Sequence, residues 1–185
     1  MSLDNQQKGK KIHTRTIEIS SYDCGDGNIL VEGELKDDVL IPIYVSGKKC
    51  QPHTVHNMVI RLLVACSSLT IKEIKVAMPG IPYDYCLETA DSLYAIKGLK
   101  IAPGFTAKVK KILGKSKRCL HLTTLLHAIA PAVMQGYWIY NGGEPNGDSV
   151  SSDTIDNYLV DTCWAWRKDG PLIDRIKQGE NWPLE

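Results

Sequence analysis

Apolar and polar side chains alternate with a period of two through most of the first 80 residues, which is typical of half-buried strands. The Asp26-Gly27 pair between two such stretches is a strong hairpin signal, and Pro42 favours a sheet edge for the stretch that contains it. Residues 57–66 are apolar on both faces apart from Arg61, as in a central strand. Strands are therefore predicted at residues 14–21, 28–36, 39–45, 57–66 and 70–78.

After Pro79 the apolar spacing changes to that of helices. Helices are predicted at residues 86–97, 106–113 and 120–140. The last and longest carries one apolar stripe, and Pro131 lies beside that stripe, where it is expected to kink the helix. Strands that precede the helices, rather than alternate with them, indicate an α+β fold with a mainly antiparallel sheet followed by three helices.

The C-terminal part of the chain gives a weaker pattern. An Asp169-Gly170 turn separates two short apolar stretches, 162–167 and 172–176, and predicts a hairpin laid back on the sheet. Residues 144–153 are rich in Gly, Pro, Asp and Ser, which predicts a surface loop.

Length and composition limit the number of domains and the class of partner. A chain of 185 residues with 43% hydrophobic content fits one globular domain. We expect that domain to span residues 13–178, between a tail at 1–12 and another at 179–185. The net charge of +1, from 22 Lys and Arg against 21 Asp and Glu, gives no overall attraction to duplex nucleic acid or an anionic membrane. We therefore expect neither nucleic acid nor a membrane as a partner. The sequence leaves open whether the protein binds another protein.

One stretch raises the question of a membrane. Residues 119–143 carry no charged side chain and are long enough to cross a bilayer. His121, Thr123 and Pro131 lie inside this run, so a buried core helix explains it better. The polar first eleven residues do not resemble a signal peptide. We therefore expect a cytoplasmic protein whose six cysteines are thiols or metal ligands rather than disulfides.

Cys86 and Cys119 each stand where a loop leads into a predicted helix. The free N–H groups and the positive dipole end of a helix favour the thiolate, the form that binds metal or attacks an electrophile. The alternative is that both cysteines are only packed in the core, as small hydrophobic residues commonly are. Both interpretations stay open, as does the role of Cys163.

Two histidines add nitrogen donors to these two sulfurs. His121 follows Cys119 by two residues, and His56 stands at the entry to the predicted central strand. Thiolate sulfur and imidazole nitrogen together suit zinc or iron. We predict that a mixed site of His56, Cys86, Cys119 and His121 forms at one end of the sheet and binds zinc, iron or an iron–sulfur cluster.

Short motifs occur along nearly the whole chain. In the first half they are His13-Thr14-Arg15, Asp26-Gly27, Val31-Glu32-Gly33-Glu34-Leu35, His56-Asn57-Met58 and Arg61-Leu62. In the second half they are Cys86, Gly98-Leu99-Lys100-Ile101, Pro103-Gly104-Phe105, Cys119-Leu120-His121-Leu122, Cys163 and Arg167-Lys168-Asp169-Gly170. In this combination they resemble the family called domain of unknown function 2889 (DUF2889). The resemblance implies a bacterial source and carries no known activity.

The order of elements also resembles that of iron–sulfur cluster assembly scaffolds. Those proteins carry one cysteine near the start of the first strand, one after the second strand and one before the final helix. Cys86 and Cys119 match the last two positions, and His56 stands where the first cysteine would be. The resemblance therefore implies a mixed Cys/His metal site more than cluster assembly itself.

Three hypotheses about function remain open, and the sequence does not decide whether the protein is an enzyme. The first is a metal- or iron–sulfur-binding protein. The second is a thiol enzyme in which Cys86 or Cys119 is the nucleophile and a histidine is the base. The third is a structural or partner-binding module whose cysteines only pack. A nucleotide enzyme or a serine hydrolase has no support, because the sequence holds no P-loop, no GxSxG and no GxGxxG after a strand.

Overall fold

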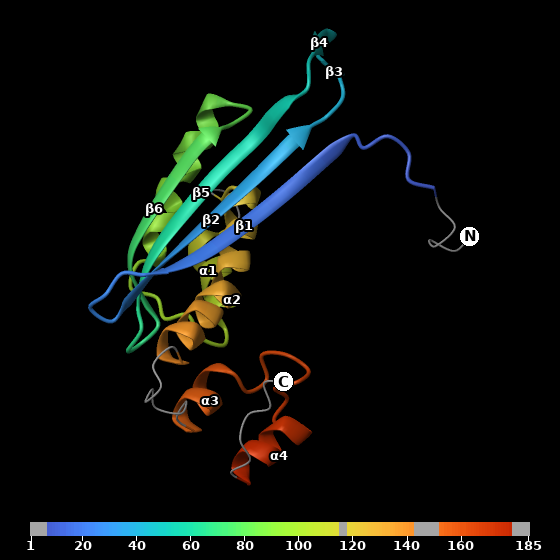
Figure 1. Cartoon of the computed structure of the whole chain (residues 1–185). Coiled ribbons are helices and arrows are strands. Elements are labelled where there is room, and N and C mark those ends of the chain that lie inside the picture. The colour runs from blue at the N-terminus through green and yellow to red at the C-terminus, as the bar shows by residue number, and fades with distance from the viewer. Residues whose placement is uncertain (1–6, 115–117, 143–151, 179–185) are drawn as a thin grey trace.

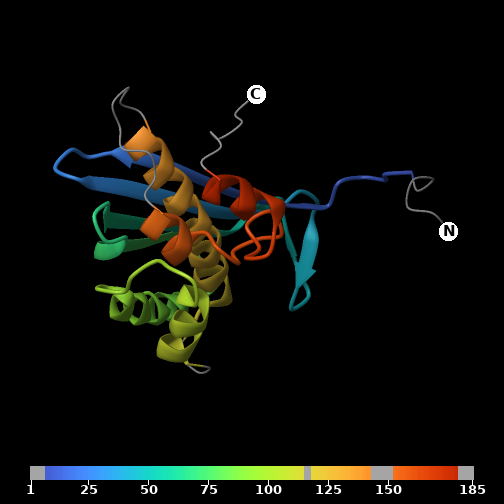
Figure 2. The ribbon, with the colours of Figure 1, turned by 90° about the horizontal axis from the view of Figure 1, so that it is seen from below.

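Four long strands form one antiparallel sheet in the order β1-β2-β5-β6 (Figure 1). The structure is a computed structural model, and it describes residues 7–114, 118–142 and 152–178. The strands of the sheet are β1 (His13–Asp23), β2 (Asn28–Val39), β5 (His53–Ala65) and β6 (Thr70–Gly80). A short hairpin of β3 (Ile43–Val45) and β4 (Lys48–Cys50) joins β2 to β5 and stands out at one end of the sheet (Figure 2).

Helical segments follow the strands, so the predicted α+β class and the mainly antiparallel sheet are confirmed. The segments are η2 (Asp84–Thr89), η3 (Asp91–Ile96), α1 (Phe105–Leu113), α2 (Leu120–Gly142), α3 (Ser152–Tyr158) and α4 (Pro171–Lys177). The predicted tails up to residue 6 and from residue 179 lie outside the described residues, and so does most of the predicted loop at 144–153.

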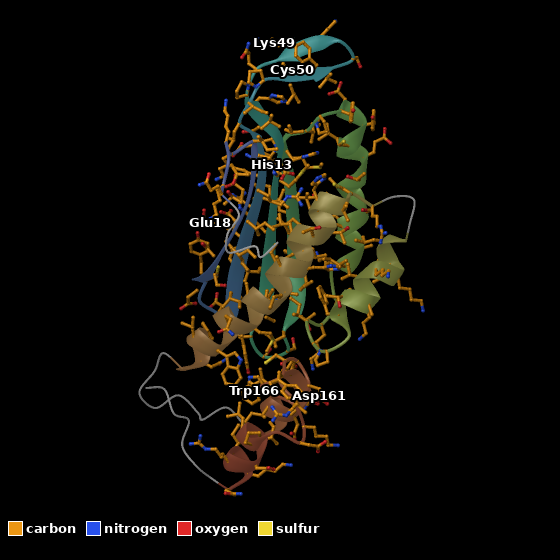
Figure 3. The ribbon with its side chains drawn as sticks, turned by 90° about the vertical axis from the view of Figure 1, so that its right-hand side faces the viewer. His13, Glu18, Lys49, Cys50, Asp161 and Trp166 are labelled. Carbon is orange, nitrogen blue, oxygen red and sulfur yellow. The ribbon has the colours of Figure 1, made fainter. Side chains whose placement is uncertain are left out.

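The helices cover one face of the sheet. Along β2 the side chains alternate between buried and half-buried, and the buried series includes Ile29, Val31 and Leu35. Helix α2 packs against β1, β2 and β5, and Figure 3 shows it on one side of the sheet while Glu18 lies on the other. Asp37 continues the buried series of β2, so a carboxylate faces the helices where the sheet would otherwise present another aliphatic side chain.

Two glycines let α2 lie directly on the sheet. A Cβ atom at Gly33 on β2 would stand 2.7 Å from Cδ1 of Ile129 and 3.1 Å from Cδ1 of Leu125, both on α2. One at Gly136 on α2 would stand 2.6 Å from Oγ of Ser21 on β1. The depth at which α2 sits on the sheet therefore depends on these two missing side chains.

We expect Gly33→Ala to lower the free energy of unfolding by about 1–3 kcal/mol, because overpacking forces Ile129 and α2 to shift. The matched control is Gly9→Ala, since a Cβ atom at Gly9 meets no atom within 4 Å. Urea unfolding followed by circular dichroism measures both variants. Equal stabilities for the two would show that α2 does not depend on this close approach.

The helix predicted at 86–97 is instead two consecutive 3-10 segments, η2 and η3. Hydroxyl groups explain the difference, since they bond to carbonyls three residues earlier. Thr89 Oγ1 donates to the carbonyl of Cys86, and Ser92 Oγ donates to that of Thr89. Such local bonds compete with the regular pattern of an α-helix.

The predicted C-terminal hairpin is wrong, because its second half is α4. Gly170 is the residue before the helix, with extended backbone at φ −98° and ψ 154°, and Pro171 lies in the first turn. Proline at this position has its φ already set for a helix and loses no hydrogen bond there. The Asp169-Gly170 pair therefore leads into a helix rather than turning between two strands.

The long uncharged run forms α2 as predicted, and its buried residues make it a core helix. The helix continues through Pro131 without interruption. Across the described residues, no helix combines the length and the apolar character needed to cross a membrane.

Candidate metal centre

Three neighbouring strands place three polar side chains in one row across the sheet. Asp37 on β2 lies directly opposite Arg15 on β1 and directly opposite His56 on β5. Residues that face each other across antiparallel strands point to the same face of the sheet. The row therefore lies on the face that α2 covers.

Asp37 is the centre of this row and is only 4% exposed. Arg15 donates from Nε to Oδ1 and from Nη2 to Oδ2, both at 2.7 Å. His13 Nε2 lies 3.3 Å from Oδ1, and His56 Nδ1 lies 3.1 Å from Oδ2. One buried carboxylate is thus surrounded by a guanidinium group and imidazole rings, the partners that make its burial tolerable.

Helix α2 adds a further imidazole to the group. The ring of His121 stacks on the ring of His56, with centroids 3.7 Å apart and planes at 26°. Nε2 of His121 lies 3.6 Å from Oδ2 of Asp37. One ligand atom from each of Asp37, His56 and His121 lies within 4.8 Å of the other two, so these three side chains form a possible metal-binding site.

The start of α2 is held in place by a second buried polar residue. Thr123 is 7% exposed, and Asp37 and Thr123 are the buried polar residues of the described chain. Thr123 donates to the carbonyl of Cys119 from Oγ1 at 2.8 Å and from its backbone N–H at 3.0 Å. Sγ of Cys119 lies 3.8 Å from Nδ1 of His121. These contacts fix the turn that carries His121 over the sheet.

Two β-bulges flank His56. The register between β2 and β5 shifts between Asp37 and Asp38, and that between β5 and β6 shifts between Asn57 and Val59. Bulges bend a strand and re-aim its side chains, and they are common beside active sites.

The surroundings of Asp37 and His121 shift both pKa values in the direction that a metal ligand needs. The bond from Arg15 lowers the pKa of Asp37 to about 2, against the opposing effect of burial. Burial lowers the pKa of His121, and the neighbouring His56 adds to this. At neutral pH Asp37 is therefore a carboxylate and His121 a neutral imidazole.

The structure brings together two of the four predicted site residues and places a third beside them. His56 and His121 stack, and Cys119 touches His121 through the ring nitrogen that faces away from Asp37. Cys86 lies in η2 and belongs to no group of three or more metal-ligating side chains in the described chain. All six cysteines are free thiols, with Cys163 exposed.

Asp37 and Arg15 were not predicted as site residues from the sequence. The signal that could have found them is the Asp26-Gly27 turn, since a hairpin centred there brings Arg15 opposite Asp37. An acidic residue at an inward position of an otherwise apolar strand was a second signal.

Helices cover one face of the antiparallel sheet, and an Asp/His/His group lies under the start of the longest helix. The chain is therefore an α+β protein with a possible metal site. The chain belongs to the family "Protein of unknown function (DUF2889)", whose model matches residues 13–135. The match confirms the predicted family and spans every residue of the Asp37 group. No curated protein and no solved structure matches the chain. The resemblance to iron–sulfur scaffolds stays a prediction.

Proposed function

We propose that Asp37, His56 and His121 bind one divalent transition-metal ion, zinc or iron(II). The observation that carries the proposal is the convergence of a carboxylate oxygen and two imidazole nitrogens within 4.8 Å. Two histidines and one carboxylate are the protein ligands of many catalytic zinc sites and of non-haem iron(II) sites. The group contains no sulfur, which favours a single ion over an iron–sulfur cluster.

Asp37 has room for a metal ion although Arg15 already bonds to it. A carboxylate offers about four lone-pair positions, and Arg15 uses one on each oxygen. Nδ1 of His56 and Nε2 of His121 lie 3.1 and 3.6 Å from Oδ2. A metal ion between these atoms would take the place of the proton in the hydrogen bond between His56 and Asp37. Arg15 and His13 would then hold the carboxylate in orientation, as hydrogen bonds to metal ligands commonly do.

Three protein ligands support a catalytic role better than a structural one. Structural zinc sites are closed by four protein ligands, whereas catalytic sites keep a position for water or substrate. A metal ion held here would supply a Lewis acid and a bound water of lowered pKa. The cytoplasm, which we propose as the compartment, keeps the neighbouring Cys119 as a thiol.

The experiment that tests the proposal is metal analysis of the full-length protein purified without oxygen. We expect about one zinc or iron per chain, and the same content in Cys86→Ala, because Cys86 lies outside the group. Loss of metal in Cys86→Ala would return the site to the mixed Cys/His set predicted from the sequence. A chain without stoichiometric metal, even after reconstitution with zinc or iron(II), would contradict the proposal.

The second candidate function is a thiol enzyme, and one observation favours it. His121 contacts Cys119 through one ring nitrogen and Asp37 through the other, with Sγ 3.8 Å from Nδ1 and Oδ2 3.6 Å from Nε2. Nucleophile, base and orienting carboxylate stand in this order in cysteine hydrolases. The two candidates need opposite tautomers of His121. A metal ion takes Nε2 and leaves the proton on Nδ1, whereas a thiol base needs Nδ1 free and the proton on Nε2.

Substitution of Cys119 separates the two candidates. If the role of Cys119 is to accept a hydrogen bond from Nδ1–H of His121, Cys119→Ala should weaken metal binding about 10- to 100-fold. This is the usual effect of losing a hydrogen-bond partner of a metal ligand. Cys119→Ser should restore most of that affinity, because a hydroxyl oxygen also accepts this bond. Competition with a chromophoric chelator measures both variants. An unchanged affinity in Cys119→Ala would contradict this role.

Alkylation of the wild-type protein with iodoacetamide gives the complementary test. We expect Cys119 to react no faster than the exposed Cys24 and Cys163, as judged by mass spectrometry of digests. A much faster reaction at Cys119, abolished in His121→Ala, would favour the thiol enzyme.

A further inference from the structure

We propose that the metal centre takes a small oxyanion, a carboxylate or a phosphate group, bound jointly by the metal ion and Arg15. The inference rests on the proposed metal site and names the class of ligand that completes it. It follows from the charge, the exposure and the unused hydrogen-bond donors of the group.

The charges of the group do not balance once a metal ion is bound. A divalent ion and Arg15 face one negative charge, that of Asp37, which leaves a formal charge of +2. The other side chains in contact with Asp37 are imidazoles, which add no negative charge. Uncompensated charge in a partly buried site is costly, so an anionic ligand is favoured over a neutral one.

Exposure shows from which side a ligand reaches the group. The exposed fraction of the side chains falls from 49% at His13 and 40% at Arg15 to 25% at His121, 17% at His56 and 6% at Asp37. The group is therefore open to solvent on the side of β1 and closed around the carboxylate of Asp37. His13, at the start of β1, is labelled in Figure 3.

Arg15 stands on that open side with donors to spare. A guanidinium group has five N–H donors, and Arg15 gives two to Asp37, from Nε and Nη2. The remaining three can bond to a carboxylate or a phosphate, which the planar guanidinium group matches in shape and charge. An oxyanion here would bind Arg15 with one oxygen and occupy an open metal position with another.

The charge distribution along the chain supports an anionic ligand. Residues 92–143 hold eight Lys and Arg and no Asp or Glu. The rest of the chain therefore holds 14 Lys and Arg against 21 Asp and Glu. The overall charge of +1 conceals this asymmetry. Arg118, the last basic residue of this segment, directly precedes Cys119 and the start of α2, so it adds positive charge close to His121.

The test uses full-length protein loaded with cobalt(II), whose visible spectrum reports the coordination of the ion. Sodium acetate, inorganic phosphate and acetamide are the probes. We expect acetate, phosphate or both to change the spectrum saturably, and acetamide, the neutral analogue of acetate, to leave it unchanged. The tighter of the two anions identifies the carboxylate or the phosphate class.

Paired variants test the part of Arg15. Arg15→Lys keeps the positive charge but loses the planar guanidinium group that can donate two parallel hydrogen bonds. We expect it to weaken anion binding about tenfold. The control is Arg61→Lys, because Arg61 is also paired with a carboxylate of the neighbouring strand, that of Glu32. We expect this control to change anion binding less than twofold.

Each outcome decides between the two proposals. A bound cobalt ion with no response to either anion, or with equal responses to acetate and acetamide, overturns the oxyanion ligand and leaves the metal site standing. Equal affinities in the two arginine variants remove Arg15 from the ligand site. Failure of the wild-type protein to bind cobalt, zinc or iron(II) overturns the metal site and the oxyanion ligand together.

Discussion

Replacing His56 with alanine is expected to lower metal affinity at least about 100-fold, since losing a ligand costs no less than losing a partner of one. His53→Ala is the matched control. Both histidines lie on β5, but His53 is exposed and its ring nitrogen bonds to the carbonyl of Gln51 rather than to Asp37. Isothermal titration with zinc measures the two variants beside the wild type.

A second pair on α2 extends the same comparison. His121→Ala should lose metal as His56→Ala does, whereas His127→Ala should keep it, because His127 lies on the same helix outside the Asp37 group. Burial lowers the pKa of both His121 and His127, so the pair separates ligation from burial as the cause of any loss. Equal affinities in His56→Ala and His53→Ala would refute the proposed ligand set.

The parts of this fold that the sequence predicted are those governed by a regular period. The alternation of β2 and the long apolar stripe of α2 each specify one buried face, so their positions follow from the chain itself. The 3-10 segments and α4 did not follow, because hydroxyl bonds to nearby carbonyls and a proline in the first helical turn override the apolar pattern there.

The site was predictable in part for a similar reason. His56 and His121 were predicted because His56 stands at the entry to the central strand and His121 follows Cys119 at a helix start. Their contact depends on how α2 lies over the sheet, which Gly33 and Gly136 control and no local pattern reveals. Cys86 attracted equal notice, yet it lies in a 3-10 segment and outside the Asp37 group.

Asp37→Asn is expected to lower the free energy of unfolding of the metal-free protein by about 3 kcal/mol at neutral pH. Breaking a buried ion pair from one side usually costs 3–5 kcal/mol, and the partial exposure of Arg15 places this pair at the lower end. Asp38→Asn is the control, because Asp38 bonds to the Thr54 hydroxyl and lies outside the row. A surface change of that kind should stay within about 0.5 kcal/mol.

The dependence of this difference on pH identifies the carboxylate as its source. The pKa of Asp37 is about 2 in the folded protein and near 4 in an unfolded chain, so the folded state favours the ionised form. The stability it contributes is complete above about pH 4 and is lost as the pH falls toward 2. The lowered pKa of His121 has its own window, since its protonation below about pH 6.5 favours the unfolded chain. This effect is larger in Asp37→Asn, because in the wild type the carboxylate of Asp37 opposes the lowering. Urea unfolding in the presence of a chelator should therefore show a gap between wild type and Asp37→Asn that does not shrink between pH 7 and about 4, and that narrows below pH 4. A gap that persists unchanged to pH 2.5 would mean that shape, not the charge of Asp37, holds β1, β2 and β5 together at this end of the sheet.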